Sequence, residues 1–339
     1  MESQTKTFYN FGMLHFIVNI RGGSGKALLK WNKIQKILKE KNIKYKTHIT
    51  QKAGHASEIA RELRKLSLSE ENDVRLVVVG GDGALNEVIN GIGRNEKDEV
   101  MPENFSKIKI GLIPTGSGND FSRGMKIPRH DPRKALEKIL SSDGNKKIDL
   151  GIATVLDDDF HDERKRKNLF AISSGFGLNA IVGTGINTAK IKKILNFIHL
   201  GKLSYGFYTI QTLFTMKTYS VNLKFDNEEP KTFKKTIFLA NMNLKSEGGG
   251  IPMNPNAKAD DGKISMCMAH GVPKIMTFFF FPFLLFGLQK NLPGFLLKDC
   301  KKLEIASDKP SVLHTDGEFR GNVKKVRWES LPGAVSLLV

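Results

Sequence analysis

Residues 80–91 read Gly80-Gly81-Asp82-Gly83-Ala84-Leu85-Asn86-Glu87-Val88-Ile89-Asn90-Gly91, and they follow the apolar run Leu76-Val77-Val78-Val79. The apolar run is typical of a buried parallel strand. Apolar residues then recur at helical spacing, at Leu85, Val88, Ile89 and Ile92. The sequence therefore predicts a glycine-rich turn, carrying one carboxylate, between a strand and a helix.

This turn suits a bound phosphate, because glycines let backbone amides approach a ligand and a helix N-terminus favours anions. A tight turn with glycines at positive φ explains the same pattern, and Gly-Gly-Asp-Gly alone does not decide between the two. Three polar residues, Asn86, Glu87 and Asn90, lie off the apolar stripe near the turn. They favour the phosphate-binding interpretation.

Two further glycine-rich segments follow predicted strands. Pro114-Thr115-Gly116-Ser117-Gly118-Asn119-Asp120-Phe121 comes after the strand 108–113, and Asn19-Ile20-Arg21-Gly22-Gly23-Ser24-Gly25-Lys26 ends the strand 14–19. The latter lacks the spacing and the ending of a Walker A loop. Strands that alternate with helices predict a parallel sheet whose ligands bind beyond the carboxyl ends of its strands. The three turns can therefore converge on one site.

The motifs at 80–91 and 114–121, in this order, resemble the catalytic domain of the diacylglycerol kinase and sphingosine kinase family, and most closely its bacterial lipid kinase branch. The resemblance continues through Gly175-Phe176-Gly177, Asn254-Pro255-Asn256-Ala257, Asp260-Asp261-Gly262 and Asp316-Gly317-Glu318. NAD kinases and phosphofructokinases of similar fold share Gly-Gly-Asp-Gly, whereas its continuation through residue 91 is more particular to lipid kinases. Two residues depart from the family pattern: Ile20 replaces a usual proline, and Ala84 replaces a frequent threonine.

The chain of 339 residues is long enough for two domains. Residues 1–128 are predicted to form an α/β nucleotide-binding domain, like that of NAD kinase or phosphofructokinase. Alternation with period two then appears at 221–225, 233–240 and 263–269, after a predicted strand at 147–155. It predicts a β-rich, sandwich-like second domain over residues 129–339, with a C-terminal end that could return to the first domain.

The resemblance implies ATP and Mg²⁺ as cofactors. Phosphoryl transfer needs a cradle for the phosphates, a cation and a base. The expected nucleotide contacts are Asn19, Thr50, Gly80, Gly81, Gly83, Glu87, Thr115, Gly116 and Ser117. Asp82 is the expected partner of a Mg²⁺ held through the phosphates, because this ion prefers oxygen ligands. Capping of the helix that follows is its alternative role, and both roles can hold together.

Two acidic turns lie later in the chain. Asp316-Gly317-Glu318 is a hairpin signal, and the resemblance assigns Asp316 as general base and Glu318 as a neighbour that tunes it. No neutralising partner of Asp316 is obvious from the sequence. The second turn, Asp260-Asp261-Gly262, is by composition an ordinary structural turn. There the resemblance implies a structural Mg²⁺ at Asp261, with main-chain carbonyls near Lys258 and Lys263.

The chain is strongly basic, with 53 Lys and Arg against 35 Asp and Glu, a net charge of +18. Such a charge suits an anionic partner, which can be a nucleotide, a nucleic acid or a membrane surface. A basic apolar segment at 189–216 can be a membrane-surface helix or a helix packed with its lysines in water. The phenylalanine-rich run at 278–288 is too short to cross a bilayer. It can be a buried element or an apolar surface that meets lipid, and we expect it to be buried.

Together these features predict an ATP-dependent lipid kinase acting on diacylglycerol or a related lipid at an anionic membrane surface. We expect a cytoplasmic, peripherally membrane-associated protein, since no signal peptide is visible. The sequence does not decide whether the protein forms a homodimer. The rivals are a kinase for a soluble acceptor such as NAD and a non-catalytic nucleotide-binding protein. A nucleic-acid partner is not expected, because no aromatic-basic RNA motif or recognition helix is apparent.

Overall fold

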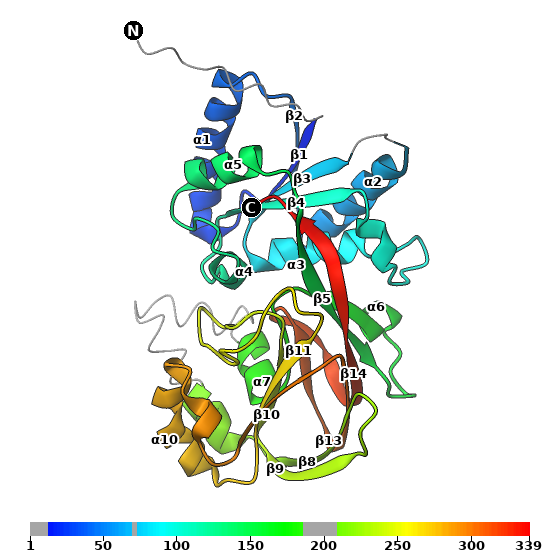
Figure 1. Cartoon of the computed structure of the whole chain (residues 1–339), viewed down its shortest axis with the longest axis vertical. Coiled ribbons are helices and arrows are strands. Elements are labelled where there is room, and N and C mark those ends of the chain that lie inside the picture. Colours follow the sequence, from blue (N-terminus) through cyan, green and yellow to red (C-terminus); the bar gives the residue numbers. More distant parts are fainter. Residues whose placement is uncertain (1–12, 70–72, 186–208) are drawn as a thin grey trace. The chain divides into compact units, whose positions relative to one another are not determined.

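The computed structural model describes residues 13–69, 73–185 and 209–339, and it divides into two compact units (Figure 1). Unit 1 comprises Met1–Lys97, Met101–Ile148 and Ala334–Val339, and unit 2 comprises Asp98–Val100 and Asp149–Gly333. The first unit thus extends past the expected boundary at residue 128. Helix α5 (Pro132–Ser141) accounts for this extension, because its Ile139 packs on Gly111 of strand β4 (Ile108–Pro114).

Unit 1 is built on a parallel sheet in the order β2-β1-β3-β4. Its strands are β1 (Leu14–Val18), β2 (Tyr45–Ile49), β3 (Val74–Gly80) and β4. The last strand of the chain, β14 (Glu318–Leu337), adds a short parallel pairing, in which Ser336 lies opposite Lys109 of β4. The side chains of β1 are all buried, as a sheet covered on both faces requires.

The helices of unit 1 pack in two pairs, α1 with α5 and α2 with α3. They span Lys26–Glu40 (α1), His55–Ser69 (α2) and Asp82–Ile92 (α3), and the short α4 spans Asp120–Gly124. Trp31 of α1 packs on Phe16 of β1. Gly91 of α3 lies so close to α2 that a Cβ there would stand 2.4 Å from the carbonyl oxygen of Ser57. Short 3₁₀ turns lie at Gly23–Gly25 and Pro102–Phe105.

Unit 2 is β-rich and mainly antiparallel, as the alternating sequence predicts. Strands β12-β11-β10-β7-β13-β14 follow one another, β5 pairs with β6, and β8 pairs with β9 and β13. The bounds are β5 (Lys146–Val155), β6 (Lys167–Phe170), β7 (Ser173–Gly177), β8 (Tyr219–Phe225), β9 (Lys231–Thr236), β10 (Phe238–Met242), β11 (Ile264–Ala269), β12 (Phe295–Cys300) and β13 (Lys302–Thr315). The strand expected at 233–240 is divided between β9 and β10.

The core of unit 2 includes Trp328, which is fully buried and whose indole Nε1–H donates to Ser174 Oγ at 2.8 Å. Cys267 is also fully buried, as expected for a core residue. The helices are α6 (Glu163–Arg166), α7 (Leu178–Gly185) and α10 (Lys274–Leu285), with a 3₁₀ turn at Gln289–Asn291. No helix within the described ranges is long and apolar enough to cross a membrane.

Two sequence expectations need correction or fall outside the described residues. The phenylalanine-rich run is not buried as a whole: it forms most of α10, where Phe279 is 61% exposed, and Phe286 just beyond the helix is 78% exposed. Periodicity could not reveal this, because all faces of the helix are apolar. The basic segment at 189–216 lies mostly outside the described residues, and its end, 209–215, is helical.

Candidate active site

The three glycine-rich turns of unit 1 meet at the carboxyl ends of β1, β3 and β4. A Cβ on Gly81 would lie 3.0 Å from the Cα of Gly116, and a Cβ on Gly23 would lie 2.0 Å from the carbonyl oxygen of Thr115. Gly23 also has a φ of 59°, which disfavours other residues. Glycines are therefore required where these backbones approach one another, and the approach places Gly80, Gly81 and Gly116 in one cluster.

Two polar atoms in this cluster are buried and have no hydrogen-bond partner among the described residues. They are the Oγ1 of Thr115 and the Oδ1 of Asn119. Asn119 adopts a φ of 50°, and its Nδ2 donates to the carbonyl oxygen of Gly116 at 2.7 Å. Buried polar atoms are normally paired. The hydroxyl of Thr115 therefore fits a ligand that accepts hydrogen bonds, such as a phosphate oxygen.

Asp82 links two of the turns, and both of its own carboxylate oxygens accept hydrogen bonds. Its Oδ2 accepts from the backbone N–H of Asp120 at 2.9 Å, and its Oδ1 accepts from that of Phe121 at 3.2 Å. Asp82 therefore caps α4, a helix distant in sequence. Asp82 is itself the first residue of α3, and its side chain reaches the neighbouring turn.

Other predicted nucleotide contacts have partners within the protein. The carboxylate of Glu87 accepts from the backbone N–H groups of Gly54 (2.9 Å) and Ala56 (3.2 Å), so it holds the start of α2. Thr50 is buried, and its hydroxyl donates to the carbonyl of Val18 at 3.4 Å. Asn19 Oδ1 accepts from the backbone of Arg21 at 3.2 Å. Ser117 is exposed beside these turns, and Gly83 lies in the first turn of α3. Their contacts with a nucleotide stay predictions.

In unit 2, Asp316 lies at the turn between β13 and β14 with a φ of 49°. Its carboxylate accepts hydrogen bonds from three consecutive backbone N–H groups, those of Ala171, Ile172 and Ser173, at 2.9–3.0 Å. These donors hold the carboxylate in one orientation. Glu318 is exposed one residue beyond Gly317.

The expectation that Asp316 has no neutralising partner is wrong, because Arg320 lies nearby. Burial lowers the pKa of the Arg320 guanidinium, and the charges of Glu318 and Asp316 act in the opposite direction. Arg320 Nε also donates to Thr315 Oγ1 at 2.6 Å. The turn therefore carries two carboxylates and one guanidinium, a more balanced charge than the motif alone suggested.

Sequence reasoning missed the polar cluster around Glu247. Ser173 Oγ donates to Glu247 Oε2 at 2.5 Å, Asn179 Nδ2 donates to Oε1 at 3.2 Å, and His314 Nε2 lies 3.9 Å from Oε2. Burial raises the pKa of Glu247. The backbone N–H of Ser173 donates to Asp316, and His314 accepts from the backbone N–H of Gly317, so this cluster braces the turn. A lone glutamate before three glycines carried no signal of such a role.

His314 is neutral in this environment. Burial lowers its pKa to about 4, although Asp316 acts in the opposite direction. Its Nδ1 accepts from the backbone N–H of Gly317 at 3.1 Å. In the neutral ring the proton is therefore assigned to Nε2, on the side of Glu247. His314 links the Asp316 turn to the buried glutamate.

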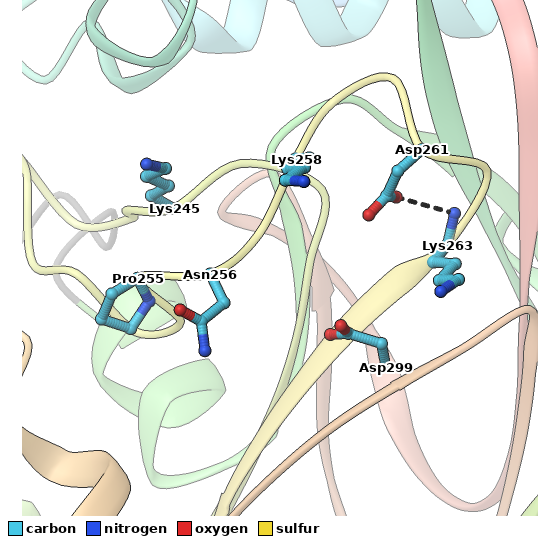
Figure 2. Close-up of a pocket in the computed structure, with 7 residues that line it drawn as sticks. All are labelled: Lys245, Pro255, Asn256, Lys258, Asp261, Lys263 and Asp299. Atoms are coloured by element: carbon cyan, nitrogen blue, oxygen red, sulfur yellow. Dashed lines mark hydrogen bonds between the residues drawn. The ribbon is translucent and has the colours of Figure 1, made fainter.

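The predicted structural Mg²⁺ site lies in a pocket lined by Lys245, Pro255, Asn256, Lys258, Asp261, Lys263 and Asp299 (Figure 2). Asp261 Oδ1 accepts from the backbone N–H of Lys263 at 3.1 Å, which closes a tight turn. The described residues contain no group of three or more His, Cys, Asp or Glu side chains placed to hold a metal. A site made from one carboxylate and main-chain carbonyls stays a prediction.

Comparison with known proteins assigns both units to families. Residues 13–153 match the diacylglycerol kinase catalytic domain, and residues 175–339 match the YegS C-terminal NAD kinase beta sandwich-like domain. The chain thus combines a diacylglycerol kinase catalytic domain with a YegS C-terminal domain. The α/β first domain and the sandwich-like second domain predicted from the sequence are confirmed.

Individual relatives match along nearly the whole chain. YtlR of Bacillus subtilis (strain 168) is 24% identical over 307 residues, which are 90% of this chain and 93% of that protein. A diacylglycerol kinase of Staphylococcus carnosus (strain TM300) is 26% identical over 306 residues, 88% of this chain and 87% of the relative. A crystal structure from Bacillus anthracis str. Sterne has the same fold, with a TM-score of 0.70, 22% identity and 97% coverage of both chains.

Proposed function

We propose that this protein is an ATP-dependent lipid kinase that transfers the γ-phosphoryl group to the hydroxyl of diacylglycerol or a related membrane lipid. The observation that carries the proposal is the contact of Gly81 with Gly116 beside the unpaired, buried hydroxyl of Thr115. Closely approaching backbone at the ends of parallel strands is suited to nucleotide phosphates. The proposal is also supported by the match of residues 13–153 to the diacylglycerol kinase catalytic domain.

In unit 1, the backbone of the three turns would bind the phosphates, and Thr115 would donate its hydroxyl to a phosphate oxygen. Asp82 would hold Mg²⁺ together with the phosphates, since this ion prefers oxygen ligands such as a carboxylate. The bound ion would neutralise charge on the phosphates during transfer. The carboxylate of Asp82 thus fits the ion while keeping the second turn in place.

In unit 2, we assign the acceptor side of the reaction to Asp316 and Glu318. Asp316 would accept the proton of the lipid hydroxyl as the oxygen attacks phosphorus. The three backbone donors fix its orientation, so little reorganisation would be needed. Glu318 is exposed beside it and would tune its charge.

We further propose that the protein works at an anionic membrane surface without crossing it. The net charge of +18 would attract anionic headgroups, and salt would screen this attraction over roughly 8–10 Å. Peripheral attachment on the cytoplasmic side would bring the enzyme to its water-insoluble acceptor. Sedimentation velocity of the protein without lipid distinguishes a monomer from a homodimer.

The proposal is tested by incubating the protein with γ-labelled ATP and Mg²⁺ in separate reactions with diacylglycerol, a total lipid extract, sphingosine and NAD. Triacylglycerol, which has no free hydroxyl, is the matched control. We expect label in diacylglycerol and none in triacylglycerol. Label in NAD alone would identify a kinase for a soluble acceptor, and nucleotide binding without transfer to any acceptor would identify a non-catalytic protein.

A further inference from the structure

Helix α10 and the turn after it expose an unusually large set of apolar side chains. Only a narrow stripe of the helix is buried, at Thr277, Phe280 and Leu284. Phe280 packs against Phe295 with ring centroids 6.2 Å apart. The large hydrophobic side chains that are at least one-third exposed here are Ile275, Met276, Phe278, Phe279, Phe283, Leu285, Phe286 and Leu288. We call these eight residues the α10 face.

The apolar composition of the α10 face is unusual for a surface that meets water. A helix on the surface of a domain normally carries polar residues on the side that meets water, and a helix that is apolar on all sides is normally buried. Here Phe279 is 61% exposed, Phe286 is 78% exposed and Leu288 is 58% exposed. Contiguous exposed apolar surface of this kind is typical of a site that meets a partner or a membrane.

The edges of the α10 face are basic. Lys274 starts the helix and donates to the carbonyls of Phe214, at 3.2 Å, and Met216, which places exposed Lys217 near the same end. The backbone of Gly271, just before the helix, donates to the carbonyl of Lys234 at 3.1 Å, and Lys234 and Lys235 are both exposed. Lys290 is exposed two residues beyond Leu288.

Acidic residues are absent from the segments that build this region. The sequence contains no Asp or Glu between Glu163 and Asp226, between Glu229 and Glu247, or between Asp261 and Asp299. The lysines at the edges of the α10 face therefore have few carboxylates near them along the chain. An apolar face with a cationic border complements a surface that is apolar inside and anionic outside, which describes a bilayer with anionic headgroups.

We propose that the α10 face is a membrane-docking surface, which inserts its phenylalanines at the boundary between headgroups and acyl chains of an anionic bilayer. Lys217, Lys234, Lys235 and Lys290 would meet the headgroups. Pairing of two copies through this face is disfavoured, because it would bring like charges of the two borders together. The proposal deepens the proposed function by naming the surface that meets the lipid phase, but its test needs no phosphoryl transfer.

The first test places a fluorophore on the face. The native tryptophans, Trp31 and Trp328, are 2% and 0% exposed, so an added surface tryptophan reports on its own surroundings. Phe286→Trp should show blue-shifted emission on vesicles of equal phosphatidylcholine and phosphatidylglycerol, and brominated lipid should quench it. Leu29→Trp, at a position on α1 that is 65% exposed, is the matched control and should show neither effect. An unshifted, unquenched Phe286→Trp would overturn the proposal.

The second test removes the apolar side chains. Phe279→Ser/Phe286→Ser should lower the partition onto these vesicles by roughly tenfold or more, because two exposed rings no longer leave water. Leu28→Ser/Leu29→Ser, which also removes two exposed apolar side chains, should bind like the parent. Equal partition of the parent onto pure phosphatidylcholine vesicles at low salt would contradict the anionic preference.

Sedimentation velocity without lipid separates docking from self-association. If the parent is a dimer that Phe279→Ser/Phe286→Ser converts to monomers, the α10 face is a subunit interface and the membrane proposal is wrong. A protein that docks through α10 but phosphorylates no lipid would refute the proposed function alone. A parent that phosphorylates diacylglycerol in vesicles while Phe286→Trp stays in water would refute the docking surface alone.

Discussion

The carboxylate of Asp82 accepts the backbone N–H of Asp120 at 2.9 Å, across 38 positions of sequence. With the bond to Phe121, this contact joins the first glycine-rich turn to the helix that follows the second. The one carboxylate of the Gly-Gly-Asp-Gly motif therefore has a structural role, in addition to any binding of a metal ion. Any test of its chemistry must separate the two roles.

Asp82→Asn should lower phosphoryl transfer strongly and also cost about 1–2 kcal/mol of unfolding free energy, because one cap acceptor becomes a donor. Asp131→Asn is a matched control, since Asp131 Oδ1 caps α5 by accepting from Arg133 and Lys134. It should lose similar stability in chemical denaturation and keep its transfer rate. Equal activities of the two variants would show that Asp82 acts only as a cap.

Asp316→Asn should lower kcat by a factor on the order of 10²–10⁴, since a general base contributes about that much. Nucleotide affinity, measured by calorimetry, should barely change, because the proposed phosphate cradle is built from other residues. Glu318→Gln should have a smaller effect on kcat.

Asp226→Asn is a close structural control for the Asp316 variant. Asp226 also has a positive φ, of 47°, and its Oδ1 accepts from the backbone N–H groups of Lys301 and Lys302 at 2.9 and 2.8 Å. We expect this variant to keep kcat. If Asp316→Asn and Asp226→Asn behave alike, Asp316 is a structural turn residue and the assignment as base is wrong.

His314 should make folding less stable as the pH falls. Its pKa is about 4 in the folded protein against 6.5 for a free side chain, so the unfolded state binds the proton first. Between pH 6.5 and 4 this linkage should remove about 3 kcal/mol of unfolding free energy. His314→Asn should lose that part of the pH dependence, measured by denaturant unfolding at several pH values. His161→Asn, at an exposed position, should retain it, and a slope unchanged in His314→Asn would contradict the assignment.

Glu247 should respond differently to removal of its charge and removal of its side chain. Glu247→Gln should be at least as stable as the parent at neutral pH, because burial raises the pKa of this carboxyl and disfavours its charged form. Glu247→Ala should lose roughly 2–4 kcal/mol, since Ser173 and Asn179 would lose their acceptor. Thermal unfolding of both variants measures the contrast. A less stable Gln variant would show that the charge itself is needed.

The sign of the Glu247 contribution is opposite to that of His314. A carboxyl whose folded pKa is raised contributes stability at low pH, and this contribution is lost as the pH rises through the folded pKa. Glu247→Gln should therefore flatten the decline of stability with rising pH above the ordinary range of a glutamate. His15, His48 and His270 also have lowered pKa values, so they contribute to the pH dependence of stability in the parent. The difference between each variant and the parent removes their contribution.

Much of the fold follows from local patterns. The strand before Gly80 and the helix after it were predictable, because apolar residues change from a continuous run to helical spacing at the glycines. The β-rich character of unit 2 followed from period-two alternation at 221–225 and 263–269. These patterns arise because one face of a strand or one stripe of a helix is buried, and a short segment of sequence is enough to show them.

The missed features depend on contacts between distant parts of the chain. The hydrogen bonds that Asp82 accepts from α4, and the one that Glu247 accepts from Ser173, join residues tens of positions apart. No short window of sequence contains both partners. The exposure of Phe279 was misjudged for another reason. Hydrophobicity tells which side chains can be buried, but in α10 only Thr277, Phe280 and Leu284 are, because burial depends on what the rest of the fold packs against them.

The central claim is transfer of phosphate to a lipid hydroxyl, and the most direct measurement is the stoichiometry of products with diacylglycerol vesicles and ATP. We predict that each ADP formed is matched by one lipid phosphate monoester, detected by ³¹P NMR, and that both require Mg²⁺. Asp316→Asn should lower both products together. Formation of ADP without a lipid monoester, or of a monoester on a soluble acceptor only, would contradict the account.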